Sequence, residues 1–303
     1  MDSVKNQFSL SIDWEDFGQL LCRDHLGIIT PPLDAIVRQT EIILGMLERH
    51  EAKATFFVLG LLAKDRPDLV KRIAADGHEV ALHGMNHIAL TKLDREETRA
   101  DIEESLDIVQ QVSGEKVYGF RAPYFSINES NLFALEVLSE LGLQYDSSIF
   151  PIRMRRYGIA GFETTPQVYA LPNKKEIVEL PLTVSKLAGR RMPVCGGGYM
   201  RLLPLWVLRR LFKRLESVPM IAPIIYMHPY EFDTTPINCT SNYPEDVEPL
   251  PSYKTALLNL KWNLLRQSIR EKIDFFLNEY SFVTCKSKAD HVKSSTQCPT
   301  ILG

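Results

Sequence analysis

The sequence has few cysteines and no long apolar run, and each lack narrows the kind of protein it encodes. Its five cysteines, in a chain of 303 residues, are scattered and form no CxxC pair. This distribution argues against a disulfide framework and is typical of a reducing compartment. The longest apolar stretch, VPMIAPIIYM at 218–227, contains two prolines and falls well short of the ~20 residues that a membrane-spanning helix needs. We therefore expect no transmembrane segment.

An excess of charge of one sign is also lacking. The net charge is −3, so the composition indicates neither a nucleic-acid partner nor a polybasic membrane patch. Residues 1–17 contain neither the apolar core nor the small-residue cleavage site of a signal peptide. We therefore expect a cytoplasmic protein, and a homo-oligomer is compatible with the sequence. The hydrophobic content of 45% is ordinary for a globular chain.

Strand and helix patterns alternate about five times through residue 150, which is typical of βα units. They predict one α/β domain over residues 1–285, built as a distorted (β/α) barrel of about seven parallel strands. Strands are expected at 7–13, 54–60, 79–84, 117–123 and 144–150, and helices at 33–50, 66–77, 94–114 and 128–142.

The rhythm is lost over residues 151–200, which are rich in Arg, Pro and Gly. We expect a hairpin and long loops there, inserted on one face where they shape substrate choice. The glycines of CGGGY at 195–199 lack the Lys-Ser/Thr of a phosphate-binding loop and predict a flexible turn. Beyond them, the pattern predicts a helix at 203–217, a strand at 223–229, one long helix at 255–280, a closing strand at 281–285 and a loose polar tail at 286–303.

Polar side chains gather where the expected strands end. In a parallel barrel the carboxyl ends of the strands meet at one rim, so these side chains are expected to converge. Two imidazoles with a carboxylate form a usual ligand set for a catalytic divalent metal with an open position. The residues concerned are Asp13, Glu15, Asp16, His83, His87, Arg121, Asp146 and His228.

Five motifs in chain order resemble those of the polysaccharide deacetylase family, carbohydrate esterase family 4. They are SIDWED, ATFFVLG, HGMNH, RAPY and YMHP, and together they extend from about residue 8 to 285. The DWED opening and the HPYEFD ending look most like the branch found with bacterial exopolysaccharide and cell-surface glycan synthesis. The resemblance implies a (β/α) barrel and a metal-dependent deacetylase.

The resemblance also implies roles for the matching positions. Asp13 matches the general base, and Arg121 matches the arginine that orients it. Tyr124 matches the position whose backbone N–H helps hold the oxyanion, and His228 matches the general acid. His83 and His87 match metal ligands, with zinc the first choice and cobalt, nickel or manganese as alternatives.

The sequence departs from the family at three points, one of which is Tyr226 in place of the family's leucine before the acid histidine. Trp14 follows Asp13 where two adjacent aspartates are usual, so the metal carboxylate is either Glu15 or Asp16. Alternation along a strand favours Glu15, and a bend directly after Asp13 would favour Asp16. The aspartate that tunes the acid histidine has no clear counterpart, and Asp146 is the one candidate.

Three functions remain open from the sequence. The leading one is a metal-dependent amidohydrolase that removes the acetyl group from an N-acetylated sugar or glycan precursor. The second keeps the fold and the metal but opens a small cyclic amide or imide. The third is a non-catalytic member that binds a glycan or a protein, for which Trp14 and the missing aspartate are the support.

Overall fold

The first strand illustrates how the sequence builds the barrel. In β1 (Ser9–Trp14), with the sequence SLSIDW, polar and apolar residues alternate, so their side chains point to opposite faces. Leu10, Ile12 and Trp14 enter the main hydrophobic core. Ser11 and Asp13 point to the other face, where both contact the Arg121 side chain inside the barrel.

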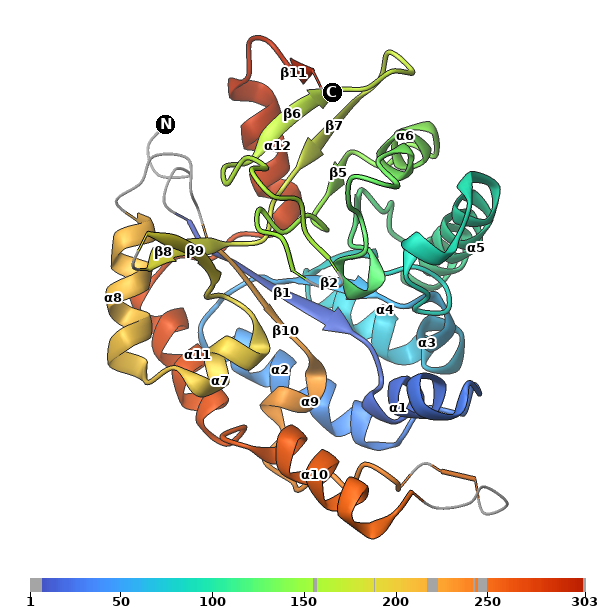
Figure 1. Ribbon diagram of the computed structural model, residues 1–303, viewed down its shortest axis with the longest axis vertical. Coiled ribbons are helices and arrows are strands. Elements are labelled where there is room, and N and C mark those ends of the chain that lie inside the picture. The colour runs from blue at the N-terminus through green and yellow to red at the C-terminus, as the bar shows by residue number, and fades with distance from the viewer. Residues whose placement is uncertain are drawn as a thin grey trace.

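The computed structural model describes residues 7–154, 157–187, 189–216, 223–241, 243–244 and 250–301. Its central sheet has nine strands in the order β10-β1-β2-β3-β4-β5-β7-β6-β11 (Figure 1). The bounds not yet given are β2 (Thr55–Val58), β3 (Glu79–Leu82), β4 (Gly119–Phe120), β5 (Tyr145–Asp146), β6 (Gln167–Ala170), β7 (Glu176–Glu179), β10 (Ile224–Met227) and β11 (Thr300–Ile301).

The seven strands from β10 to β7 are parallel, and the expected fold, a single-domain (β/α) barrel, is confirmed. The two ends of this parallel set approach each other directly after β7. There the Ile224 amide donates to Thr183 Oγ1 at 2.8 Å, and the Thr183 hydroxyl lies 3.4 Å from Ile224 O. A side chain thus bridges the gap in the barrel wall.

Helices surround this sheet (Figure 1). Those in the first half are α1 (Phe17–Leu26), α2 (Ala35–Arg49), α3 (Gly60–Asp65), α4 (Pro67–Ala75), α5 (Arg95–Ser113) and α6 (Phe133–Glu140). Those in the second half are α7 (Gly197–Leu202), α8 (Leu205–Glu216), α9 (Pro229–Phe232), α10 (Ser252–Asn263), α11 (Ser268–Glu279) and α12 (Cys285–Ser295). The helices expected at 33–50, 66–77, 94–114 and 128–142 correspond to α2, α4, α5 and α6.

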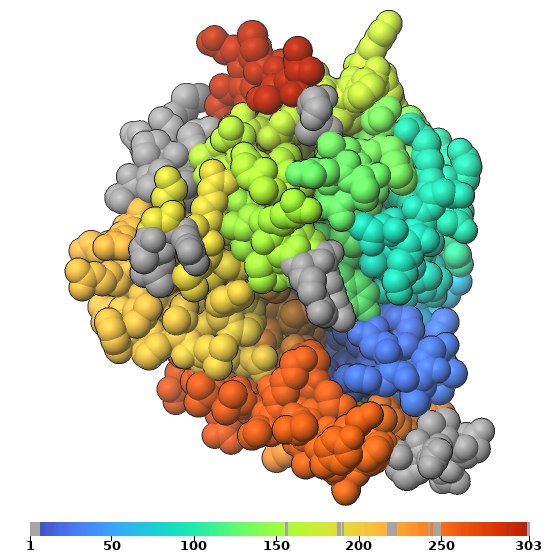
Figure 2. Space-filling view, viewed as in Figure 1, coloured from blue at the N-terminus to red at the C-terminus, as the bar shows by residue number. Residues whose placement is uncertain are grey.

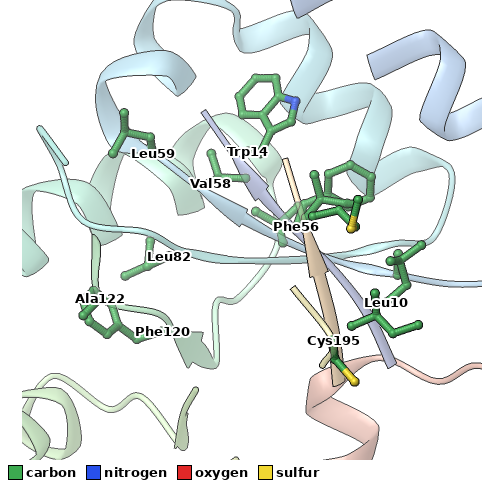
Figure 3. Close-up of a cluster of buried hydrophobic side chains, with 14 of the residues drawn as sticks. Leu10, Trp14, Phe56, Val58, Leu59, Leu82, Phe120, Ala122 and Cys195 are labelled. Atoms are coloured by element: carbon green, nitrogen blue, oxygen red, sulfur yellow. The ribbon is translucent and has the colours of Figure 1, made fainter. Parts of the chain in front are cut away.

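The main core lies between the strands and this outer helical layer. Figure 3 shows part of it, with Leu10, Trp14, Phe56 and Leu82 contributed by three neighbouring strands. Trp14 is fully buried, and its indole N–H donates to Thr40 Oγ1 of α2 at 3.0 Å. Burial of an aromatic side chain with its polar atom paired stabilises the contact between strand and helix.

The prediction of one long helix at 255–280 is wrong, because the chain turns between α10 and α11. Leu265 has a positive φ of 53°, which a continuous helix does not allow. The turn directs the Arg266 side chain inward, where it donates to Tyr230 O at 2.8 Å and to Thr235 O. Apolar periodicity continues across this break, so the pattern alone did not predict it.

The region 151–200 holds the expected hairpin and more. The antiparallel pair β6–β7 forms that hairpin, but β7 also joins the barrel sheet beside β5. A second hairpin, β8 (Val184–Leu187) with β9 (Arg190–Pro193), follows it. Residues 155–156 and 188 in this region, and Ser217 of the expected helix at 203–217, lie outside the described residues.

The end of the chain differs from a closing strand and a loose tail. Only one bridge, Phe8 with Phe282, forms in the expected strand at 281–285. The segment after it contains α12, which begins with the Cys285 amide donating to Thr55 Oγ1 at 2.8 Å. Since Thr55 is the first residue of β2, α12 covers the amino-terminal end of the barrel. The division of the chain at residue 285 stays a prediction.

Candidate active site

Four strand ends bring the expected polar residues together at the carboxyl end of the barrel. A pocket of about 280 Å³ opens there, bordered by α1 and α10, the blue and orange helices at the lower edge of Figure 2. Its lining includes Asp13, Glu15, His83, His87, Tyr124 and His228 from the expected set. Aromatic rings of Phe17, Phe125, Tyr157, Tyr230 and Trp262 form much of the remaining wall.

Glu15, His83 and His87 form a cluster that could hold a metal. One ligand atom from each lies within 4.8 Å of the others, and all three residues are buried. Glu15 Oε2 lies 2.7 Å from His87 Nε2 and 3.5 Å from His83 Nε2, yet it takes part in no hydrogen bond of good geometry. A buried carboxylate oxygen facing two imidazole nitrogens fits a divalent cation such as zinc.

Asp16, the alternative carboxylate, lies outside this cluster. Its side chain caps α1 by accepting the Gln19 amide at 2.8 Å, and burial raises its pKa to about 6. Glu15 is two residues after Asp13 and faces the same side, as strand alternation favours. Trp14, between them, packs on the opposite side against α2. The position where the family usually has a second aspartate is therefore part of the hydrophobic core in this chain.

The charge states of the cluster suit metal binding. Burial raises the pKa of Glu15, but the contacts with His87, His83 and His228 outweigh it and hold this pKa well below its usual value. Burial lowers the pKa of His87, which favours the neutral imidazole that a metal needs. His83 Nδ1 lies 2.8 Å from Arg121 O, and a proton donated there leaves Nε2 free.

His87 has a competing contact. Arg23 Nη2 lies 2.9 Å from His87 Nδ1, and this is a hydrogen bond only in the tautomer with its proton on Nε2. A ligand role for Nε2 requires the other tautomer. Metal binding at His87 would therefore displace the Arg23 guanidinium from Nδ1.

Asp13 and Arg121 form the ion pair expected from the sequence. Arg121 Nη1 donates to Asp13 Oδ1 at 2.6 Å and to Ser11 Oγ at 2.8 Å. The other arm of the guanidinium serves a different partner, with Nη2 on Ser147 Oγ and Nε on Ser147 O, each at 3.0 Å. The guanidinium is thus divided between Asp13 and Ser147, which follows β5, and the centroid of the Phe57 ring lies 4.0 Å from the guanidinium carbon.

The partner of His228 is Glu231, which the sequence reasoning missed. His228 Nδ1 lies 3.1 Å from Glu231 Oε2, and the His228 amide donates to the same oxygen at 3.0 Å. Burial lowers the pKa of His228, but the hydrogen bond to Glu231 and the charges of Glu15, Glu231 and Asp13 raise it to about 9. The available signal was the spacing in HPYE, an acid three residues after the histidine.

The expected alternative, Asp146, is not beside His228. Its oxygens accept from the hydroxyl and the amide of Ser148 at 2.6 and 3.0 Å, and Glu179 is its buried neighbour. Burial and the adjacent Asp146 carboxyl raise the pKa of Glu179 well above its usual value. Asp146 and Glu179 are paired residues of the neighbouring strands β5 and β7, and the partner of His228 is Glu231, so the assignment of Asp146 as the tuning residue is wrong.

The glycines of CGGGY explain how Glu231 reaches its place. A Cβ at Gly196 would lie 2.2 Å from the Tyr226 ring, and a Cβ at Gly197 would lie 2.1 Å from the Glu231 carboxylate. Arg201 Nε, further along α7, lies 3.5 Å from Glu231 Oε1. The expected flexible turn is wrong, since this stretch is a close-packed support for the Glu231–His228 pair.

Tyr124 lies in a short 3-10 turn at Pro123–Phe125 with a positive φ of 56°. Its hydroxyl donates to Asp24 Oδ1, and its ring packs against that of His87 with centroids 4.4 Å apart. These contacts hold the strained backbone of the turn in place, directly beside the candidate metal cluster.

Two family models match this chain, each over part of its length. Residues 33–145 match the family model for polysaccharide deacetylase, and residues 147–289 match a domain of unknown function, DUF3473. Over residues 33–145 the chain thus resembles the polysaccharide deacetylase family, carbohydrate esterase family 4.

The curated relatives resemble only part of the chain. A chitooligosaccharide deacetylase of Sinorhizobium fredii is 41% identical over 86 residues, which are 28% of this chain and 40% of the relative. A peptidoglycan-N-acetylglucosamine deacetylase of Bacillus cereus is 39% identical over 93 residues, which are 31% of this chain and 34% of the relative. The matched part thus spans between a third and two-fifths of these relatives.

One solved structure resembles the whole chain in fold. A candidate polysaccharide deacetylase from Mycobacterium smegmatis aligns with a TM-score of 0.64 over 100% of this chain and 96% of its own, at 19% identity. Within the described residues, no helix is both long and apolar enough to cross a lipid bilayer. The cytoplasmic location stays a prediction.

Proposed function

We propose that the protein hydrolyses the acetamide group of an N-acetylated sugar or glycan precursor, with a divalent metal as cofactor. The observation that carries this proposal is the convergence of a two-histidine, one-carboxylate cluster, a buried Asp–Arg pair and a histidine of raised pKa on one pocket. The match of residues 33–145 to the polysaccharide deacetylase family model supports the same reaction.

Glu15, His83 and His87 are the proposed ligands, and zinc is the preferred ion. When bound, such an ion polarises the amide carbonyl and lowers the pKa of a water molecule. The ligand set leaves positions open, because Asp16 is used as a helix cap. Binding through Nε2 requires that each imidazole carry its proton on Nδ1. For His83 the Arg121 carbonyl favours this tautomer, because it accepts a hydrogen bond from Nδ1.

Asp13 is the proposed general base. Its carboxylate accepts the proton of the attacking water, and Arg121 Nη1 at 2.6 Å holds that carboxylate in place. Arg121 is completely buried, and its hydrogen bonds to Ser11 and Ser147 fix its position. The backbone N–H of Tyr124 is proposed to donate to the developing oxyanion.

His228 is the proposed general acid. It gives a proton to the sugar nitrogen as the C–N bond breaks, which yields acetate and a free amine. A pKa of about 9 keeps the imidazole protonated near neutral pH, and Glu231 orients the ring from its Nδ1 side. The pocket's aromatic rings give the pyranose an apolar wall to pack against.

The test is acetate release by protein stripped of metal and reloaded with zinc, cobalt, nickel or manganese. N-acetylglucosamine oligomers and a small cyclic imide would be offered as separate substrates. The proposal predicts acetate from the sugars only after reloading. Ring opening of the imide without acetate release would favour the alternative hydrolase, and no turnover of either with metal bound would favour a binding protein.

A further inference from the structure

Helix α10 has two apolar faces, although a helix at the surface of a globular domain needs only one. Leu258 and Trp262 point inward and pack with the cluster of Phe17, Leu21 and Tyr230 beside the pocket. On the other side, Tyr253, Leu257, Leu260 and Leu264 follow one another at intervals of four, three and four residues. These intervals place them in one stripe along the helix.

The outer stripe is open to solvent. Its side chains are between 45% and 63% exposed, and the adjacent Leu265 is 51% exposed. Five of the eleven large apolar side chains that are exposed among the described residues lie between positions 253 and 265. Single exposed apolar residues are common, but a gathered patch marks a surface that contacts something else.

The charges beside the stripe point to the chemistry of what it contacts. Lys254 and Lys261 are both exposed and lie two turns apart, so they border the stripe on the same side. From Ser252 to Arg270 the sequence has no acidic residue, and the nearest acids along the chain are Glu248 and Glu271. The net charge of −3 conceals this local excess of positive charge.

The stripe also lies next to the candidate active site. Trp262 of α10 lines the pocket together with Glu15 and His228. Where α10 meets α11, an open hollow of about 570 Å³ is lined by Leu260, Leu264 and Leu265 among others. In Figure 2 the orange surface of α10 forms the lower edge of the molecule beside α1. Whatever the stripe contacts is therefore held near the pocket mouth.

We propose that the outer face of α10 docks on an anionic lipid surface. An apolar stripe with Tyr and Leu side chains enters the boundary between head groups and acyl chains, while lysines at its border reach the phosphates. Docking in this way would place the pocket beside sugars that are carried by a membrane lipid. This step of the inference rests on the proposed deacetylase function. The substrate class would then be a lipid-linked N-acetylated glycan.

The test is co-sedimentation of the full chain with vesicles of phosphatidylglycerol and phosphatidylcholine, and with vesicles of phosphatidylcholine alone. Binding is expected to the anionic vesicles and to weaken at high salt. The double variant Leu257→Ser/Leu260→Ser should lower the bound fraction at least about tenfold. Ile301→Ser is the matched control, because Ile301 is 83% exposed on β11, at the opposite end of the molecule in Figure 1.

Two results would overturn the docking proposal. One is equal vesicle binding by the wild type and the double variant. The other is no vesicle binding by the wild type; a dimer in sedimentation velocity that the double variant abolishes would then identify a second copy as the occupant. Thermal melting verifies that the double variant is folded, and its turnover of a soluble N-acetyl sugar should be unchanged. Vesicle binding needs no catalysis, so it fails or succeeds independently of the deacetylase proposal.

Discussion

Residues 9–146 and residues 147–289 both reach the pocket, the first mainly from the ends of three parallel strands and the second from the end of one strand, β10, and from turns and short helices. The first half supplies Asp13, Glu15, His83, His87 and Arg121. The second half supplies His228 and the side chains that hold it. The comparison indicates that the candidate metal cluster and the Asp13–Arg121 pair are built on the barrel sheet, whereas the position of His228 depends on contacts between segments far apart in sequence.

The largest effect is expected from the first half. His83→Ala removes a buried imidazole of the candidate metal cluster, so bound metal should be lost and turnover should fall about a thousandfold or more. Asp16→Asn is the matched control, because asparagine still caps α1 and should keep both metal and turnover. Metal stoichiometry and acetate release, measured on both variants, check this. Loss of metal in Asp16→Asn alone would reverse the choice of ligand.

Arg121→Lys should give the next largest effect. Lysine keeps the charge but cannot reach Asp13, Ser11 and Ser147 together, so the base loses its fixed orientation. Turnover is expected to fall about ten- to thousandfold with metal content unchanged. Steady-state kinetics beside metal analysis make the measurement. Full turnover in this variant would remove the support for Asp13 as the base.

Glu231→Gln tests the second half. Removing the negative charge beside His228 Nδ1 should lower the pKa of His228 from about 9, so the alkaline limb of the kcat–pH profile should move to lower pH. A fall in kcat of about ten- to a hundredfold with little change in KM is expected.

Asp146→Asn is the control for Glu231→Gln, since Asp146 contacts Ser148 and not His228. The alkaline limb of the kcat–pH profile of Asp146→Asn should lie at the same pH as that of the wild type. A shift in Asp146→Asn without one in Glu231→Gln would return the tuning role to Asp146.

A smaller effect, on stability, is expected at the other end of the barrel. Lys288 of α12 is buried, and burial lowers its pKa to about 8 from 10.5. The unfolded chain therefore binds more protons than the folded chain between these two values, and this group makes stability rise with pH across that window. Lys288→Met should stabilise the fold at neutral pH by about 1–3 kcal/mol.

The advantage of Lys288→Met should shrink as pH rises from 8 toward 10.5. Urea unfolding of the wild type and the variant at several pH values measures it. Other buried groups titrate in this range in both proteins, so the difference between the two isolates Lys288. A constant difference would show that Lys288 is charged in the folded state throughout.

The sequence predicted the first half well because its information is local. A repeated βα pattern specifies the strands, and the carboxyl ends of parallel strands meet at one rim. Alternation along β1 likewise favoured Glu15 over Asp16, which the structure uses as a cap.

The second half resisted prediction because its information is not local. A glycine is needed at position 197 because the Glu231 carboxylate lies where a Cβ would be. The turn before α11 is stabilised by the hydrogen bond that Arg266 donates to the Tyr230 carbonyl. These partners are separated by tens of residues in the sequence, and no periodicity records them. The helix α12 was missed for a similar reason, since few of its residues are apolar and its burial depends on contacts with the amino ends of β2 and β3.

The most direct test of this account is a crystal structure of zinc-loaded protein, with diffraction data collected on both sides of the zinc absorption edge. The account predicts one anomalous peak at about 2.0–2.2 Å from Glu15, His83 Nε2 and His87 Nε2, with an open position facing the pocket and Arg23 moved away from His87 Nδ1. Asp13 should remain paired with Arg121 beside it. A peak coordinated by Asp16, a site closed by four protein ligands, or no peak at this rim would contradict the account.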